Sequence, residues 1–117
     1  IRGLLGAIED IEVVAEASDG HEAIRLAQEQ RPHVLLMDIG MPGLNGVDAG
    51  ERIVRELPVT RVIVLSMHTG EEHVLRAIRA GASGYLLKSA APDELVRAVR
   101  QVSTGEMYLS PRVLGKL

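Results

Sequence analysis

The sequence predicts an α/β fold in which a parallel sheet is covered by helices on both faces. Short apolar runs alternate along the chain with segments of helical periodicity, and this alternation is typical of βαβ units. The run at residues 34–37 is continuously apolar, as expected of a strand that is buried on both faces. With 117 residues, the chain is long enough for one domain with a hydrophobic core.

The predicted strands and helices follow one another without an internal repeat. Strands are predicted at residues 12–17, 34–37, 61–65 and 84–87. Helices are predicted over residues 1–8, 23–27, 47–57, 74–78 and 95–102. Pro32 and Pro58 end two of these helices, because the residue before a proline avoids the helical conformation. Pro92 suits the first turn of the last helix.

The composition excludes several classes of protein. The chain has no cysteine, which rules out disulfides and zinc–thiolate sites within it. A net charge of -3 without a run of Lys and Arg argues against DNA binding by these residues. No apolar run approaches the roughly 20 residues that a membrane helix needs, and no signal-peptide pattern opens the chain. We therefore expect a cytoplasmic location.

Three predicted strands end in polar residues of complementary chemistry. Asp38, Ser66 and Lys88 each follow an apolar run, and the carboxyl ends of parallel strands meet at one edge of a sheet, where ligands bind. A carboxylate, a hydroxyl and an ammonium group together suit phosphoryl transfer to the carboxylate. Asp38 would be the nucleophile, while Lys88 and Ser66 would contact phosphoryl oxygens. A magnesium ion is expected, because two anions must approach each other.

Each of these residues also has an ordinary structural explanation. Aspartate is common in turns, a serine after a strand is often a cap or loop residue, and a lysine at a strand end is often only solvated. The combination of all three at successive strand ends is far more specific than any one of them. The sequence therefore favours a phosphoacceptor site with Asp38 at its centre.

The chain resembles the receiver domain of bacterial two-component response regulators, and most closely the NarL/FixJ (LuxR-type) group. The stretches that carry the resemblance are residues 16–20, 36–46, 64–68, 79–88 and 108–111. The resemblance implies that a histidine kinase phosphorylates Asp38, that Ser66 is a switch residue, and that Lys88 contacts the phosphoryl group. It also implies that Tyr85 is a switch aromatic that changes rotamer, and that the carbonyl of Gly40 helps to bind Mg²⁺. A surface-leaning aromatic on an edge strand is the alternative for Tyr85.

The resemblance implies a flavodoxin-like (CheY-like) doubly wound sheet with strand order 2-1-3-4-5. The first strand of that fold, which carries an acidic pair for Mg²⁺, is missing from this sequence. Without it, the two strands beside it would carry unpaired backbone groups, and Mg²⁺ binding by this chain is in doubt. Three explanations are open: the strand exists outside this sequence, which we favour; another chain supplies it by swapping; or the fragment is truncated and repacked. We expect a receiver domain at residues 1–105 and a linker at 106–117 toward an absent helix-turn-helix domain.

The implied function is a phosphorylation-controlled switch rather than an enzyme, with slow self-dephosphorylation at most. Its expected partners are a sensor histidine kinase and a second copy of the chain, with DNA bound only through the absent domain. The apolar stripe from Leu95 to Val102, together with residues 1–8, is one candidate dimer surface, and packing of that stripe on the sheet is the alternative.

Other functions stay open to different degrees. A pseudo-receiver that docks a partner without phosphorylation fits the missing acidic pair. An aspartyl-nucleophile phosphatase would need a second aspartate two residues after Asp38, where this chain has Gly40. A nucleotide-binding module is disfavoured, because neither glycine-rich phosphate-binding motif occurs.

Overall fold

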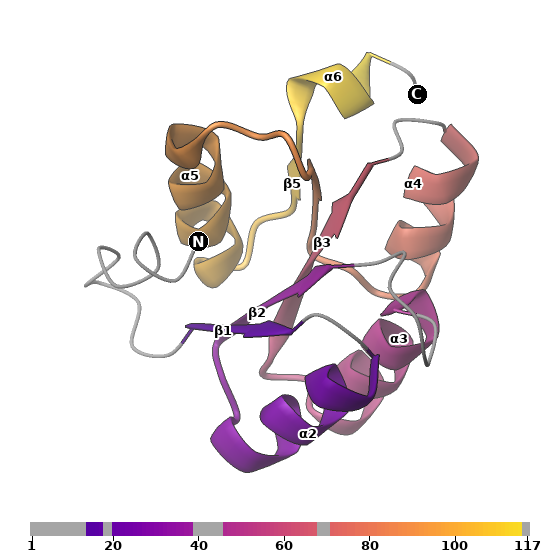
Figure 1. Cartoon of the computed structure of the whole chain (residues 1–117), viewed down its shortest axis with the longest axis vertical. Helices are drawn as coiled ribbons and strands as arrows, with labels where there is room; N and C mark the ends of the chain where they lie inside the picture. The colour runs from indigo at the N-terminus through magenta and orange to yellow at the C-terminus, as the bar shows by residue number, and fades with distance from the viewer. Residues whose placement is uncertain (1–13, 18–19, 39–45, 68–70, 116–117) are drawn as a thin grey trace.

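The computed structural model describes residues 14–17, 20–38, 46–67 and 71–115 and contains a five-stranded parallel sheet with helices on both faces (Figure 1). In spatial order the strands are β1 (Val14–Ala17), β2 (Val34–Asp38), β3 (Arg61–Ser66), β4 (Gly84–Leu87) and β5 (Tyr108–Leu109). The helices are α2 (Gly20–Gln30), α3 (Gly46–Glu56), α4 (Glu71–Arg79), α5 (Pro92–Ser103) and α6 (Pro111–Leu114). The predicted fold class is therefore confirmed.

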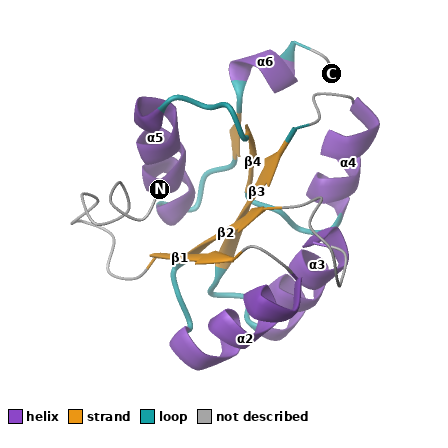
Figure 2. Cartoon of the chain, in the orientation of Figure 1, coloured by secondary structure: helices purple, strands orange, loops and turns teal. Residues whose placement is uncertain are grey.

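Alternate residues of the central strands enter two separate cores, one on each face of the sheet. Figure 2 shows α2, α3 and α4 on one side of the sheet and α5 on the other. The three-helix core joins strand residues to α2, α3 and α4, and the α5 core joins the intervening strand residues to α5. Strand residues of the three-helix core are Leu35, Met37, Val62, Val64, Tyr85 and Leu87. Those of the α5 core in β2, β3 and β4 are Val34, Leu36, Ile63, Leu65 and Leu86. Burial on both faces explains why these strands are apolar runs rather than alternating patterns.

The first two strands pair directly with each other. Val14 lies opposite Val34 and Ala17 lies opposite Met37 in a parallel register. The expectation that both strands would be left with unpaired backbone groups for want of a strand between them was therefore wrong. Direct pairing provides hydrogen-bond partners for the N–H and C=O groups that face each other, as buried backbone groups require.

Turn residues set the ends of the helices as predicted. Pro92 occupies the first turn of α5, and Gly81 lies just beyond α4 with a φ of 99°. That backbone conformation favours glycine, and a Cβ at Gly81 would lie 2.9 Å from Cγ1 of Val54 on α3. Gly81 therefore permits the close approach of the α4 end to α3.

The stripe on α5 packs on the sheet, so this candidate dimer surface was wrong. Leu95 is 5% exposed, and Val99 and Val102 are fully buried in the α5 core. Helical spacing identifies an apolar face but not what covers it, and here the sheet covers it. The other part of that candidate surface, residues 1–8, lies outside the described residues.

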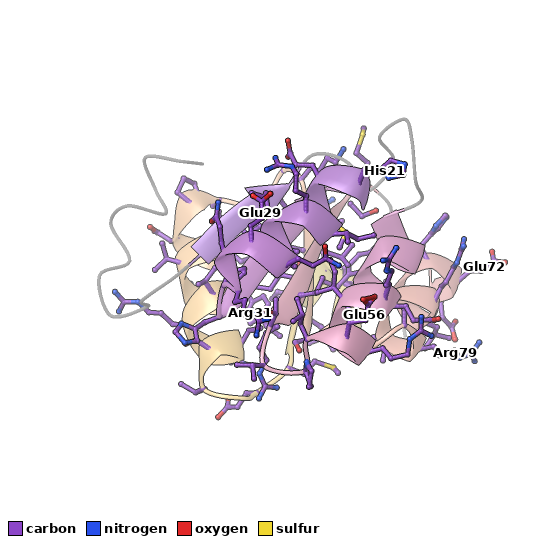
Figure 3. All side chains as sticks on the ribbon, turned by 90° about the horizontal axis from the view of Figure 1, so that it is seen from below. His21, Glu29, Arg31, Glu56, Glu72 and Arg79 are labelled. Carbon is purple, nitrogen blue, oxygen red and sulfur yellow. The ribbon has the colours of Figure 1, made fainter. Side chains whose placement is uncertain are left out.

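Charged side chains lie on the outer sides of the helices, as Figure 3 shows for Glu29, Glu56 and Glu72. On the same surfaces, Arg25 pairs with Glu29 and Arg52 pairs with Glu56 at one-turn spacing. None of the helices in the described residues is long and apolar enough to cross a membrane.

Residues 108–114, which the sequence analysis assigned to a linker, form β5 and α6 in the structure. Tyr108 lies opposite Gly84 in the sheet, and Val113 is fully buried in the three-helix core. The domain boundary after residue 105 stays a prediction, but the segment beyond it packs on the same sheet.

Candidate functional site

The carboxyl edge of the sheet brings together the three strand ends that the sequence had singled out. Asp38 ends β2 opposite Leu65, and Ser66 ends β3 opposite Leu87. The main-chain N–H of Lys88 donates a hydrogen bond of 2.9 Å to the carbonyl of Ser66, which extends the β3–β4 pairing by one step. The backbone positions of Asp38, Ser66 and Lys88 are thus adjacent along one edge.

The side chains of these residues are described to different extents. Ser66 is fully buried at this edge, whereas Lys88 is exposed. The side chain of Asp38 lies outside the described part of the structure, as does Gly40, the expected contributor of a carbonyl to Mg²⁺. The roles of these residues stay predictions.

The hydroxyl groups of Ser66 and Tyr85 are hydrogen-bonded to each other inside the three-helix core. Tyr85 lies opposite Val64, two residues before Ser66, so both side chains point to the same face of the sheet. Tyr85 is fully buried, and burial raises the pKa of its phenol, while the bond to Ser66 acts in the opposite direction.

The alternative that Tyr85 is a surface-leaning aromatic on an edge strand was wrong. Its side chain has no exposed area, and β4 is paired on both sides, with β3 and with β5. The edge position is taken instead by β5, which the sequence analysis had assigned to a linker. Tyr85 therefore lies where a movement of Ser66 would change its surroundings directly.

An open pocket of about 390 Å³ lies beside Ser66 at the same edge. The residues that line it are Ser66, Met67, Leu87, Lys88, Ser89 and Arg112. Two of these side chains are cations and two carry hydroxyl groups, and the lining residues that the structure describes include no carboxylate. Such a lining suits an anion with several oxygens, for which guanidinium, ammonium and hydroxyl groups are the usual donors.

Arg112 is the residue of this pocket that sequence reasoning missed. It belongs to α6, whose four residues are too few for a helical period to be recognised. The available signal was Pro111, since proline is favoured at the first position of a helix. Nothing in the sequence pattern placed that helix at the carboxyl edge of the sheet.

The described residues contain no group of three or more histidine, aspartate or glutamate side chains that could hold a metal ion. Of the ligands expected for Mg²⁺, only the backbone of Asp38 is described. These residues do not by themselves form a metal site, and magnesium binding stays a prediction.

Comparison with known proteins identifies the family. A family model described as the response regulator receiver domain matches residues 1–100. The transcriptional regulatory protein DegU of Brevibacillus brevis is 40% identical over 117 residues, which are 100% of this chain and 50% of that protein. The nitrate/nitrite response regulator NarL of Escherichia coli K12 is 39% identical over 110 residues, which are 94% of this chain and 51% of NarL. The chain thus spans about half the length of these relatives.

Solved structures support the same grouping. A LuxR-family two-component response regulator from Aurantimonas sp. SI85-9A1 aligns with a TM-score of 0.81 and 37% identity. The alignment covers 96% of this chain and 84% of that one. At this level of identity, both the fold and the sequence of the present chain are similar to those of a LuxR-family regulator.

Proposed function

Because this chain belongs to the response regulator receiver domain family, of the NarL/LuxR type, we propose that it is a switch whose Asp38 accepts a phosphoryl group from a histidine kinase. The observation that carries the proposal is the carboxyl edge, where Asp38, Ser66 and Lys88 occupy three adjacent strand ends. A rigid parallel sheet holds these positions, so a phosphoryl group on Asp38 would lie next to Ser66 and Lys88.

The proposed chemistry is a transfer between two nucleophiles. A carboxylate oxygen of Asp38 bonds to phosphorus while the P–N bond of the kinase phosphohistidine breaks. The leaving group is neutral imidazole because the phosphohistidine reacts with a proton already on its other ring nitrogen. The ammonium group of Lys88 and the hydroxyl of Ser66 would stabilise the negative charge on the phosphoryl oxygens. Bound Mg²⁺ would supply further positive charge, and Asp38 and the Gly40 carbonyl are the ligands that this chain would contribute.

The proposed switch starts from the Ser66–Tyr85 hydrogen bond. A phosphoryl group beside Ser66 competes for its hydroxyl, because a charged acceptor forms a stronger hydrogen bond than a neutral phenol does. Loss of the hydrogen bond to Ser66 changes the balance of interactions of the buried Tyr85 hydroxyl, which favours a different arrangement of the Tyr85 side chain. A local charge would thereby bias a two-state element of the three-helix core.

In the intact protein, we propose that this change controls pairing of two copies and, through a separate domain, DNA binding in the cytoplasm. The domain itself would be a phosphoacceptor and not a turnover enzyme, with slow self-dephosphorylation as its only reaction with water. The relatives are transcriptional and response regulators about twice as long as this chain, which agrees with an output outside it.

Intact mass spectrometry tests this function directly. The intact protein is incubated with acetyl phosphate and Mg²⁺, with and without EDTA, beside an Asp38→Asn variant. The proposal expects the mass of one phosphoryl group in the wild type with Mg²⁺, and no gain in Asp38→Asn or with EDTA. A folded wild type that gains no phosphoryl group would instead point to a pseudo-receiver that docks its partner without phosphorylation.

A further inference from the structure

The short helix α6 is attached to β4, the strand that contains Tyr85 and ends just before Lys88. The N–H of Tyr108 donates to the carbonyl of Ser83 at 3.0 Å, and the N–H of Ser110 donates to the carbonyl of Tyr85 at 3.2 Å. These bonds hold the start of α6 against β4. Figure 1 shows α6 between α5 and α4 at the end of the sheet to which β3 runs.

The buried side of α6 belongs to the same core as Tyr85, the proposed switch residue. Val113 is fully buried and belongs to the same three-helix core as Tyr85, Leu87 and Val74 of α4. We expect a rearrangement of the Tyr85 side chain to reach Val113 through this shared core, because close-packed cores do not absorb such changes without movement.

α6 also contributes a cation to the open pocket. Arg112, next to Val113, lines this pocket with Lys88, Ser66 and Ser89. Arg112 is exposed and makes no ion pair with another residue that the structure describes. Its long side chain and planar guanidinium group can donate two parallel hydrogen bonds to a phosphoryl group, whereas lysine acts as a point charge.

We propose that Arg112 is a second cationic ligand of the phosphoryl group on Asp38, so that α6 senses phosphorylation directly. This inference rests on the proposed function, because it requires a phosphoryl group at the carboxyl edge. The phosphoryl group then acts on α6 at two adjacent residues, on Arg112 through charge and on Val113 through the Tyr85 side chain. The segment that follows the receiver sheet is thereby part of its binding site.

The test measures binding of trifluoroberyllate, a stable analogue of the phosphoryl group, to the intact protein in the presence of Mg²⁺. Thermal unfolding midpoints are recorded while the analogue is titrated, since a ligand of the folded state raises the midpoint by an amount that depends on the ratio of its concentration to its dissociation constant. The variants are Arg112→Gln, Arg112→Lys and, as a matched control, Arg79→Gln. Arg79 is an exposed arginine in the last turn of α4. That end of the helix leads into the start of β4 and so lies at the edge of the sheet opposite the carboxyl edge.

We expect Arg112→Gln to need about fivefold more analogue than the wild type for the same rise in unfolding midpoint. The factor is modest because the ion pair is partly solvated. Arg112→Lys should recover part of this loss, and 0.5 M NaCl should reduce the difference between wild type and Arg112→Gln. Arg79→Gln should behave as the wild type does, and without the analogue all variants should unfold at similar temperatures.

If the wild type responds and Arg112→Gln needs the same concentration of analogue, the role of Arg112 is overturned and the proposed function stays intact. A difference that 0.5 M NaCl and Arg112→Lys do not change would also overturn it, since charge would then not be the cause. A wild type that does not respond to the analogue at all would overturn both proposals.

Discussion

On one face of the sheet, α2, α3, α4 and α6 cover a core that contains Tyr85 and its hydrogen bond to Ser66. On the other face, α5 alone among the described helices covers residues of β2, β3 and β4 that are all aliphatic. Both faces are built from the same strands, since neighbouring residues point to opposite sides. Tyr85 interacts with Ser66, which lies at the carboxyl edge beside the pocket, whereas Tyr108 of the α5 core interacts with Glu94 and Arg97 of α5. We therefore assign switching to the three-helix core and support to the α5 core.

The largest expected effect comes from a cavity in the α5 core. Leu86→Ala removes a fully buried side chain and should lower the free energy of unfolding by about 3 to 5 kcal/mol. If this core is only a support, the response to trifluoroberyllate should keep its wild-type size. Urea unfolding and the analogue titration measure the two quantities, with the milder Ile63→Val variant as a second case. A weakened analogue response in folded Ile63→Val would break the proposed division between the faces.

A smaller change in the free energy of unfolding is expected at alkaline pH. The core on each face of the sheet contains one tyrosine whose ionisation contributes to it. Burial raises the phenol pKa of Tyr85 in the three-helix core and of Tyr108 in the α5 core, the latter also through the negative charge of Glu94. The folded state therefore retains these protons when the unfolded state begins to lose them near pH ~10.

This contribution to stability is fully present below that pH and is lost as pH rises through the folded-state pKa values. Urea unfolding between pH 8 and 11 should show a falling free energy of unfolding. The decline should be less steep in Tyr85→Phe and in Tyr108→Phe than in the wild type. Equal slopes in all three proteins would contradict the effect of burial on these groups.

The smallest effect is expected on the outer surface, away from both cores. Arg25 and Glu29 form an ion pair of 3.2 Å on α2, but their side chains are 56% and 59% exposed. Arg25→Gln should therefore lower the free energy of unfolding by no more than about 0.5 kcal/mol, and this difference should vanish in 1 M NaCl. A loss above about 1 kcal/mol in urea unfolding would mean that the outer surface of α2 matters more than its exposure indicates.

Sequence patterns identified most of the fold because its signals are local. Apolar runs located β2, β3 and β4, helical spacing located α2 to α5, and the residues after the strands were found by the same means. The pairing of β1 with β2 was not predictable in this way, because a hydrophobic pattern indicates which face of a strand is buried but not which strand lies beside it.

Within the site, the sequence located Asp38, Ser66, Lys88 and Tyr85 but not how their environments differ. The Ser66–Tyr85 hydrogen bond depends on the register of β3 and β4, which periodicity does not give. Arg112 depends on the position of a four-residue helix, which is set by the pairing of β5 and the burial of Val113. Long-range packing decided both features.

The attachment of β5 also has a consequence for the time scales of the molecule. β5 has two residues at the edge of the sheet, and α6 is anchored mainly by one buried valine. Releasing that valine and Tyr108, which is 6% exposed, costs about 1.5 to 3 kcal/mol for each side chain, so the sum lies at the low end of the roughly 5 to 15 kcal/mol of a whole domain. The segment can thus detach while the remaining strands stay folded, and its amide protons should exchange with solvent far sooner than those of β3. The backbone hydrogen bonds of the edge strand β5 should therefore be shorter-lived than those of the central strands in the same sheet.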